Sequence, residues 1–176
     1  MTKKVAWLGM LVALAFVFSY IESLIPIQLG IPGAKLGLSN LVVMVALYTM
    51  DDKYAFALAV VRIILNGFAF GGMAAMIYSL AGGMLSFFVM AGVKRIGSFS
   101  SSKTGVPKFR VGVLGVSVLG GVFHNVGQII AAMLVLETPS LIYYLPALTV
   151  CGTASGTAIG VLAAMVIRRV RKVVKL

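Results

Sequence analysis

Residues 73–93 read MAAMIYSLAGGMLSFFVMAGV, a run of 21 residues without a charged side chain. An α-helix rises about 1.5 Å per residue, so a helix of this length spans roughly 30 Å, the thickness of the hydrocarbon core of a bilayer. An uncharged run of this length is long enough to cross a membrane as one helix. The run therefore predicts a transmembrane helix within an integral membrane protein.

The composition of the whole chain supports this prediction. Of 176 residues, 61% are hydrophobic and 11% are charged, and the mean hydropathy is +1.09. Soluble domains have about 25% charged residues. The net charge of +11 comes from basic residues in short segments between and after apolar runs, a pattern typical of membrane topology. We therefore expect membrane lipid around the protein and no nucleic acid as a partner.

The apolar runs predict a single all-α membrane domain, a bundle of about six transmembrane helices. The expected spans are residues 5–20, 36–50, 54–70, 73–93, 111–136 and 141–167, with a cytoplasmic loop at 94–110. With the N-terminus inside, 13 of the 15 basic residues fall in cytoplasmic segments, as the positive-inside rule requires. We therefore expect a multi-pass protein of the cell membrane with both termini in the cytoplasm.

Arg62 lies inside the predicted span 54–70. An arginine at the centre of a span costs at least about 2.5–3.5 kcal/mol to insert, and it usually faces a partner or a water-filled cavity. Two interpretations stay open: a ligand completes the site, or Arg62 reaches helix-end carbonyls or a partner subunit. Asn66 lies one helical turn later on the same face, which favours a polar cavity.

Carboxylates that could pair with Arg62 are scarce. The acidic residues of the chain are Glu22, Asp51, Asp52 and Glu137. The two aspartates lie about 15 Å from Arg62 along its helix, and we expect both glutamates at the external surface. The sequence therefore places no carboxylate at the depth of Arg62, which favours an anionic ligand or a ligand carbonyl.

A second polar cluster, His124, Asn125 and Gln128, lies in the predicted span 111–136. Their spacings of three and four residues put all three on one broad helix face. They are candidates for ligand contact, and the alternative is hydrogen bonding between helices. His124 is the only histidine, and no cysteine or carboxylate pair accompanies it at ligand spacing, so we expect no metal site.

Residues 32–40, PGAKLGLSN, precede and begin the second span. The candidate gating loop comprises Pro32, Gly33, Ala34 and Lys35. Lys35 and Asn40 are also candidate ligand contacts. Lys35 offers a positive charge, and Asn40 lies at the start of the second helix, where free N–H groups attract anions. The alternative is a structured connector that contains a capping residue.

Two patterns resemble enzyme motifs without the required residues. Residues 97–104, GSFSSSKT, resemble a P-loop, but Ser102 replaces the second glycine and no strand precedes the motif. Asp51-Asp52 resembles the magnesium-binding motif of prenyl transferases, but the chain contains no other aspartate. We therefore expect neither an ATPase nor a stand-alone prenyl transferase, no other enzymatic activity, and no intrinsic cofactor.

The segments PGAKLGLSN (residues 32–40) and GVFHNVGQ (residues 121–128), within six predicted spans, carry a family resemblance. Over essentially the whole chain, the protein resembles the membrane family labelled heptaprenyl diphosphate synthase component I, also called the Gx transporter family. That family is in turn similar to the S components of energy-coupling factor (ECF) transporters. S components are six-helix vitamin-binding subunits that join a transmembrane coupling protein and two ATPases.

The resemblance implies an ECF S-component-like bundle that captures a small molecule at the outer face. It implies that Gly9 and Ala13, a small-x-x-x-small pair on the first helix, dock on the coupling protein, and that Pro32 to Lys35 act as a gate. By the same analogy, a flavin or related cofactor is the leading candidate ligand. Two alternatives remain: a non-catalytic membrane accessory subunit in polyprenyl diphosphate or quinone biosynthesis, and a purely structural assembly partner.

Overall fold

The computed structural model describes residues 2–24, 37–99 and 112–173. Within these ranges all regular structure is helical, so the all-helical prediction is confirmed. The α-helices are α1 (Thr2–Leu24), α2 (Leu38–Thr49), α3 (Asp52–Asn66), α4 (Gly72–Phe99), α5 (Val113–Val135) and α6 (Leu145–Val173). A π-helical turn, η1 (Gly67–Gly71), joins α3 to α4, and a 3₁₀-helix, η2 (Pro139–Tyr144), lies between α5 and α6.

Four stretches of the described chain are long and apolar enough to cross a bilayer. They are Lys4–Leu24, Asp52–Ile96, Val113–Val135 and Pro139–Lys172. The second stretch contains both α3 and α4, whereas α2 has 12 residues, about 18 Å of helix, and is shorter than the hydrocarbon core. These lengths support a membrane protein. Six crossings and a cytoplasmic location for both termini stay predictions.

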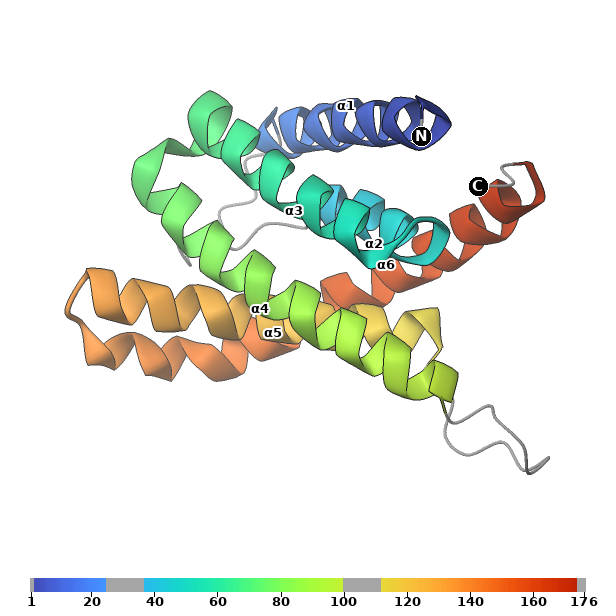
Figure 1. Ribbon diagram of the computed structural model, residues 1–176. Coiled ribbons are helices and arrows are strands. Elements are labelled where there is room, and N and C mark those ends of the chain that lie inside the picture. The colour runs from blue at the N-terminus through green and yellow to red at the C-terminus, as the bar shows by residue number, and fades with distance from the viewer. Residues whose placement is uncertain (1, 25–36, 100–111, 174–176) are drawn as a thin grey trace.

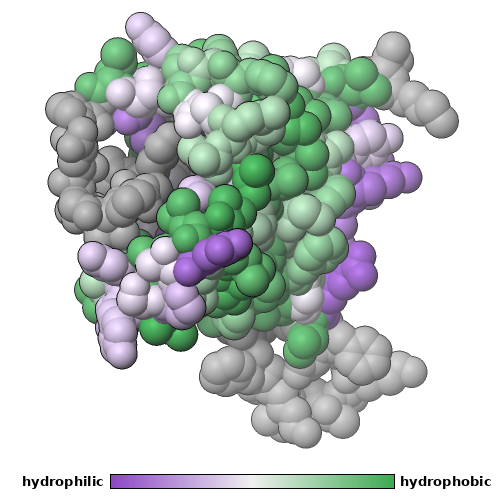
Figure 2. All heavy atoms as spheres, turned by 90° about the vertical axis from the view of Figure 1, so that its left-hand side faces the viewer, coloured by the Kyte–Doolittle hydropathy of each residue, from purple (hydrophilic) through white to green (hydrophobic). Residues whose placement is uncertain are grey.

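The surface also fits a lipid environment. Large hydrophobic side chains are exposed on several helices, with Phe68, Leu134, Tyr143 and Val150 exposing between 70% and 84% of their surface. Figure 2 shows one face on which hydrophobic residues dominate, while strongly hydrophilic residues gather mainly along one edge. Exposing so large an apolar area to water is unfavourable, whereas contact between this area and lipid tails is favourable.

Helix α2 lies at the centre of the bundle. Residues 42–47 are all buried, so this helix is enclosed on every side, as expected for a helix that is apolar all round. It packs against α1, α3 and α6, and Figure 1 shows α3 passing in front of it. Because α2 is enclosed in this way, the polar side chains at its first turn face other helices.

Both termini of the described chain reach the turn between α2 and α3. The ammonium group of Lys4 on α1 lies 3.0 Å from the carboxylate of Asp51. Arg171 on α6 donates a hydrogen bond to the backbone carbonyl of Tyr48, with an Nη2–O distance of 3.0 Å. The N- and C-terminal ends therefore lie at the same end of the bundle (Figure 1).

An ion-pair cluster ties α3 to α4 at this same end. The carboxylate of Asp52, the first residue of α3, lies 2.8 Å from Lys94 Nζ and 2.9 Å from Arg95 Nη2. Asp52 also stands at a helix N-terminus, where a negative charge interacts favourably with the helix dipole. The cluster therefore fixes how α3 and α4 meet at the end that carries both termini.

Glycines allow α4, α5 and α6 to touch through their backbones. A Cβ added at Gly121 on α5 would lie 2.4 Å from the carbonyl oxygen of Gly152 on α6. A Cβ added at Gly127 would lie 2.8 Å from the Cα of Gly82 on α4. Such small-residue contacts are typical of close helix packing in membranes. The two glycines of residues 121–128 therefore set how tightly α5 packs on both neighbours.

The chain reverses direction between α3 and α4 at η1. Gly72, the first residue after this turn, has φ +70° and ψ 173°, a backbone conformation that is open to glycine and disfavoured for other residues. A Cβ added at Gly67 would lie 2.6 Å from the Met76 side chain, so the turn is tightly packed. This reversal brings the end of α3 against the beginning of α4, where the polar pocket lies.

Candidate functional site

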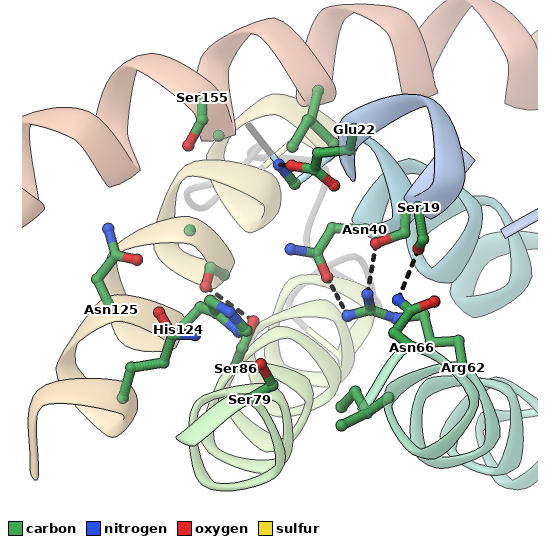
Figure 3. A pocket seen from close by; sticks show the side chains of 18 of the residues that line it. Ser19, Glu22, Asn40, Arg62, Asn66, Ser79, Ser86, His124, Asn125 and Ser155 are labelled. Carbon is green, nitrogen blue, oxygen red and sulfur yellow. Dashed lines mark hydrogen bonds between the residues drawn. The ribbon is translucent and has the colours of Figure 1, made fainter. Parts of the chain in front are cut away.

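A polar pocket lies between the helices (Figure 3). All six α-helices and η1 contribute to its wall, and its volume is about 90 Å³. Water needs roughly 30 Å³ per molecule in the liquid, and a cavity of about 150 Å³ in a protein core accommodates a benzene ring. In this conformation the pocket therefore has room for a few water molecules or a small ligand.

Arg62 on α3 is the buried cation of the pocket and exposes 6% of its surface. Its Nη1 donates a hydrogen bond to Ser39 Oγ at 2.6 Å, and its Nη2 donates to Asn40 Oδ1. Both acceptors are neutral side chains from the first turn of α2. The buried Nε has no hydrogen-bond partner among the described residues. Two of the three guanidinium nitrogens are thus held by the protein.

Glu22 on α1 lines the same pocket, so the expectation that no carboxylate shares the surroundings of Arg62 is wrong. Helix α1 continues through Leu24, past the predicted end of the span at residue 20, and this extra turn carries Glu22 to the pocket. Its Oε1 accepts a hydrogen bond from the backbone N–H of Gly37, just before α2. Its negative charge also acts on the Arg62 guanidinium.

The hydrogen bonds around Ser19 fix the orientation of the Asn66 side-chain amide. Ser19 Oγ donates its proton to the carbonyl oxygen of Ala15 at 2.9 Å. A hydroxyl has one proton, so Ser19 can only accept from Asn66, whose Nδ2 lies 2.6 Å away. Asn66 Oδ1 is buried and has no hydrogen-bond partner in the described part of the chain. The side chain of Asn66, which lines the pocket, therefore has an oxygen that accepts no hydrogen bond from the described residues.

The three polar residues of α5 all line the pocket, and they differ in their contacts. Asn125 Nδ2 donates a hydrogen bond to the carbonyl oxygen of Leu148 on α6 at 2.6 Å, which is the helix-packing role. His124 Nδ1 is buried without a hydrogen-bond partner among residues 2–24, 37–99 and 112–173. Such buried polar atoms are rare and indicate a missing partner. Ligand contact by His124 and Gln128 stays a prediction, and both side chains lie on the wall of the pocket.

Six serines also line the pocket, and only Ser39, within residues 32–40, belongs to a segment that the sequence analysis marked. They are Ser19, Ser39, Ser79, Ser86, Ser117 and Ser155. Ser86 Oγ donates a hydrogen bond to the carbonyl oxygen of Gly120 at 2.8 Å, which joins α4 to α5. Ser79 and Ser86 are seven residues apart and so lie on one helix face, and this spacing is the only sequence feature that could have indicated them.

The other predicted site residues have different surroundings. Pro32, Gly33, Ala34 and Lys35 lie outside the described residues, and Asn40 lines the pocket beside Arg62. Gly9 and Ala13 lie on an exposed face of α1. A Cβ added at Gly9 would meet no atom within 4 Å, so no described part of the chain covers this position.

Comparison with known proteins identifies the family. Residues 11–166 match the family described as "Heptaprenyl diphosphate synthase component I", and the chain belongs to that family. The resemblance predicted from residues 32–40 and 121–128 is therefore confirmed, while the wider similarity to S components stays a prediction. No curated protein and no solved structure matches the chain.

Proposed function

We propose that this member of the heptaprenyl diphosphate synthase component I family is a substrate-binding membrane subunit, similar in role to the S component of an ECF transporter. The observation that carries the proposal is the setting of Arg62. This buried cation donates hydrogen bonds to two neutral side chains, the charge of Glu22 in the same pocket acts on it, and its buried Nε has no partner in the described chain. Burying a charge costs several kcal/mol unless it is well paired, and a ligand that binds Arg62 would offset that cost.

In this proposal the chain binds its substrate and does not catalyse a reaction. Transport would require a transmembrane coupling protein and two ATPase subunits, because the sequence contains no complete nucleotide-binding motif. The family description names a component, which is compatible with protein partners. The exposed face of α1 around Gly9 and Ala13 is the proposed docking surface, since small residues permit close helix approach.

The volume of the pocket limits which ligands are reasonable. At about 90 Å³, it is smaller than the cavity of about 150 Å³ that accommodates benzene. A flavin, which has three fused rings, would bind only after the helices around the pocket move apart. A ligand with fewer atoms needs less rearrangement, so the flavin remains a prediction that the pocket volume disfavours.

Ligand-dependent stabilisation tests the proposal. The purified protein in detergent is incubated with the small-molecule fraction of a cell extract, and its midpoint of thermal unfolding is measured. A ligand that binds only the folded state raises the midpoint by mass action. We expect the extract to raise the unfolding midpoint of the wild type and to leave that of Arg62→Gln unchanged. An equal increase in both proteins would contradict a role for Arg62 in binding.

The family description itself favours a second candidate, a non-catalytic membrane accessory subunit in polyprenyl diphosphate or quinone biosynthesis. This role predicts co-purification with a soluble prenyl transferase and no loss of that association in Arg62→Gln. Transport predicts co-purification with a coupling protein and ATPases instead. Affinity purification from a native membrane therefore distinguishes the two candidates.

A further inference from the structure

We infer that the C-terminal end of α6 binds an anionic phospholipid of the surrounding membrane, at the end of the bundle that carries both termini (Figure 1). The lipid phosphate lies against Arg168, Arg169 and Lys172, and an acyl chain lies along Val161 and Met165. All five side chains are exposed on the same helix. This site is on the outside of the bundle, so it does not depend on the pocket or on a role in transport.

Helix α6 is long enough to reach from the hydrocarbon core into the headgroup layer. It has 29 residues, which gives a length of about 43 Å, whereas the hydrocarbon core is about 30 Å thick. Basic side chains are unfavourable inside that core. The last turns of α6, in which Arg168, Arg169, Arg171 and Lys172 follow a long apolar run, therefore lie at the level of the lipid headgroups.

One exposed face of α6 changes from apolar to basic at this level. Residues three or four apart lie next to each other on a helix surface. The exposed residues that follow one another at these spacings are Val161, Met165, Arg168 and Lys172. Arg169, four residues after Met165, stands beside this row. A phospholipid has the same order along its length, an apolar chain followed by a phosphate group, so it matches this face in both parts.

The opposite face of α6 fixes this end of the helix on the bundle. Ala163 and Ile167 expose 0% and 4% of their surface. Arg171 also points to this side, because its Nη2 donates a hydrogen bond to the backbone carbonyl of Tyr48. The row of exposed side chains is therefore held facing outward before any lipid arrives, and binding does not have to order the helix.

The three cations of this face have no carboxylate partner among the described residues. The ion pairs of the described chain involve Lys4, Lys94 and Arg95, which lie on α1 and α4. Arg168 and Lys172 are one helical turn apart, and like charges at this spacing repel each other. An anionic headgroup relieves this repulsion. The headgroup of phosphatidylcholine relieves less of it, because it carries a positive charge beside the phosphate.

Native mass spectrometry of the full chain in detergent tests the site. The protein is titrated with an equimolar mixture of phosphatidylglycerol and phosphatidylcholine that have identical acyl chains. Each basic residue close to an anionic lipid strengthens binding roughly fivefold. We expect the wild type to bind phosphatidylglycerol at least about tenfold more tightly than phosphatidylcholine. The triple variant Arg168→Gln/Arg169→Gln/Lys172→Gln should lose this preference.

Single substitutions distinguish a defined site from the general positive charge at this end of the protein. Arg169→Gln should weaken binding of phosphatidylglycerol roughly fivefold, and Arg169→Lys, which keeps the charge, should retain it. Lys53→Gln is the matched control, because it removes an exposed cation on α3, next to Asp52 at the same end, and it should leave the affinity unchanged. Thermal unfolding without added lipid checks that each variant is folded.

Four outcomes would overturn the inference. The wild type binds the two lipids equally, or the triple variant keeps the preference for phosphatidylglycerol. Lys53→Gln weakens binding as much as Arg169→Gln, which would indicate attraction to the whole basic end. Glycerophosphoglycerol, the headgroup without acyl chains, binds as tightly as the whole lipid, which would indicate a site for soluble anions.

Discussion

Replacing Gly121 with alanine tests whether α5 and α6 depend on direct backbone contact. The new Cβ would lie 2.4 Å from the carbonyl oxygen of Gly152, whereas ordinary van der Waals contact begins at 3.4 Å. The atom it meets belongs to the backbone, so no side chain can rotate away. The two helices would therefore have to move apart by about 1.0 Å, the difference between the two distances.

This separation has two energetic consequences. Overpacking a close-packed interior costs about 1–3 kcal/mol. The same movement lengthens the hydrogen bond from Asn125 Nδ2 to the carbonyl oxygen of Leu148, now 2.6 Å, one turn further along both helices, and its loss costs about 0.5–1.5 kcal/mol. We expect Gly121→Ala to lower the free energy of unfolding by about 2–4 kcal/mol.

The assay is equilibrium unfolding in mixed micelles, with increasing denaturing detergent and helix content measured by circular dichroism. Gly92→Ala on α4 is the matched control, because a Cβ at Gly92 would meet no atom within 4 Å. Alanine is the better helix former by about 1 kcal/mol, so the control should be as stable as wild type or slightly more stable. Equal stability of the two variants would refute the close approach of α5 to α6.

Two further substitutions test the ion-pair cluster and the support of the pocket. Asp52→Asn removes the carboxylate that contacts Lys94 and Arg95. We expect the free energy of unfolding to fall by about 1 kcal/mol at low salt and most of this difference to disappear at high salt. A decrease that does not depend on salt would contradict an origin in the ion pairs. Ser39→Ala removes the acceptor of Arg62 Nη1. We expect the free energy of unfolding to fall by about 1–3 kcal/mol, because a buried charged donor then lacks its partner. An unchanged free energy of unfolding would show that another group, or water, replaces the hydroxyl.

The membrane character of the chain and the burial of Arg62 in a polar pocket could be predicted from the sequence for a physical reason. Residues 73–93 contain no charged side chain and fall within α4, because an apolar run of this length is stable as a helix in lipid. A charged or amide side chain inside such a run has to face other helices. This requirement is why Arg62, Asn66 and His124 could be chosen as candidate pocket residues before any contact was known.

The position of Glu22 could not be predicted, because it depends on where α1 ends. A glutamate followed by Pro26 is typical of a surface loop, yet α1 extends to Leu24 and carries the carboxylate into the pocket. The roles of Gly121 and Gly127 in helix packing could not be predicted either, because each depends on a backbone atom of another helix. Spacing along one helix does not identify which helix will pack against it.

Native mass spectrometry of the gently purified protein tests most directly the central claim, that the pocket around Arg62 binds a small molecule. Wild type and Arg62→Gln are purified side by side, with thermal unfolding as the check that both are folded. We predict a bound small molecule on the wild type, with occupancy at least about tenfold lower on the folded variant. The same molecule at equal occupancy on both proteins, or a wild type that stays empty after incubation with the cell extract, would contradict the claim.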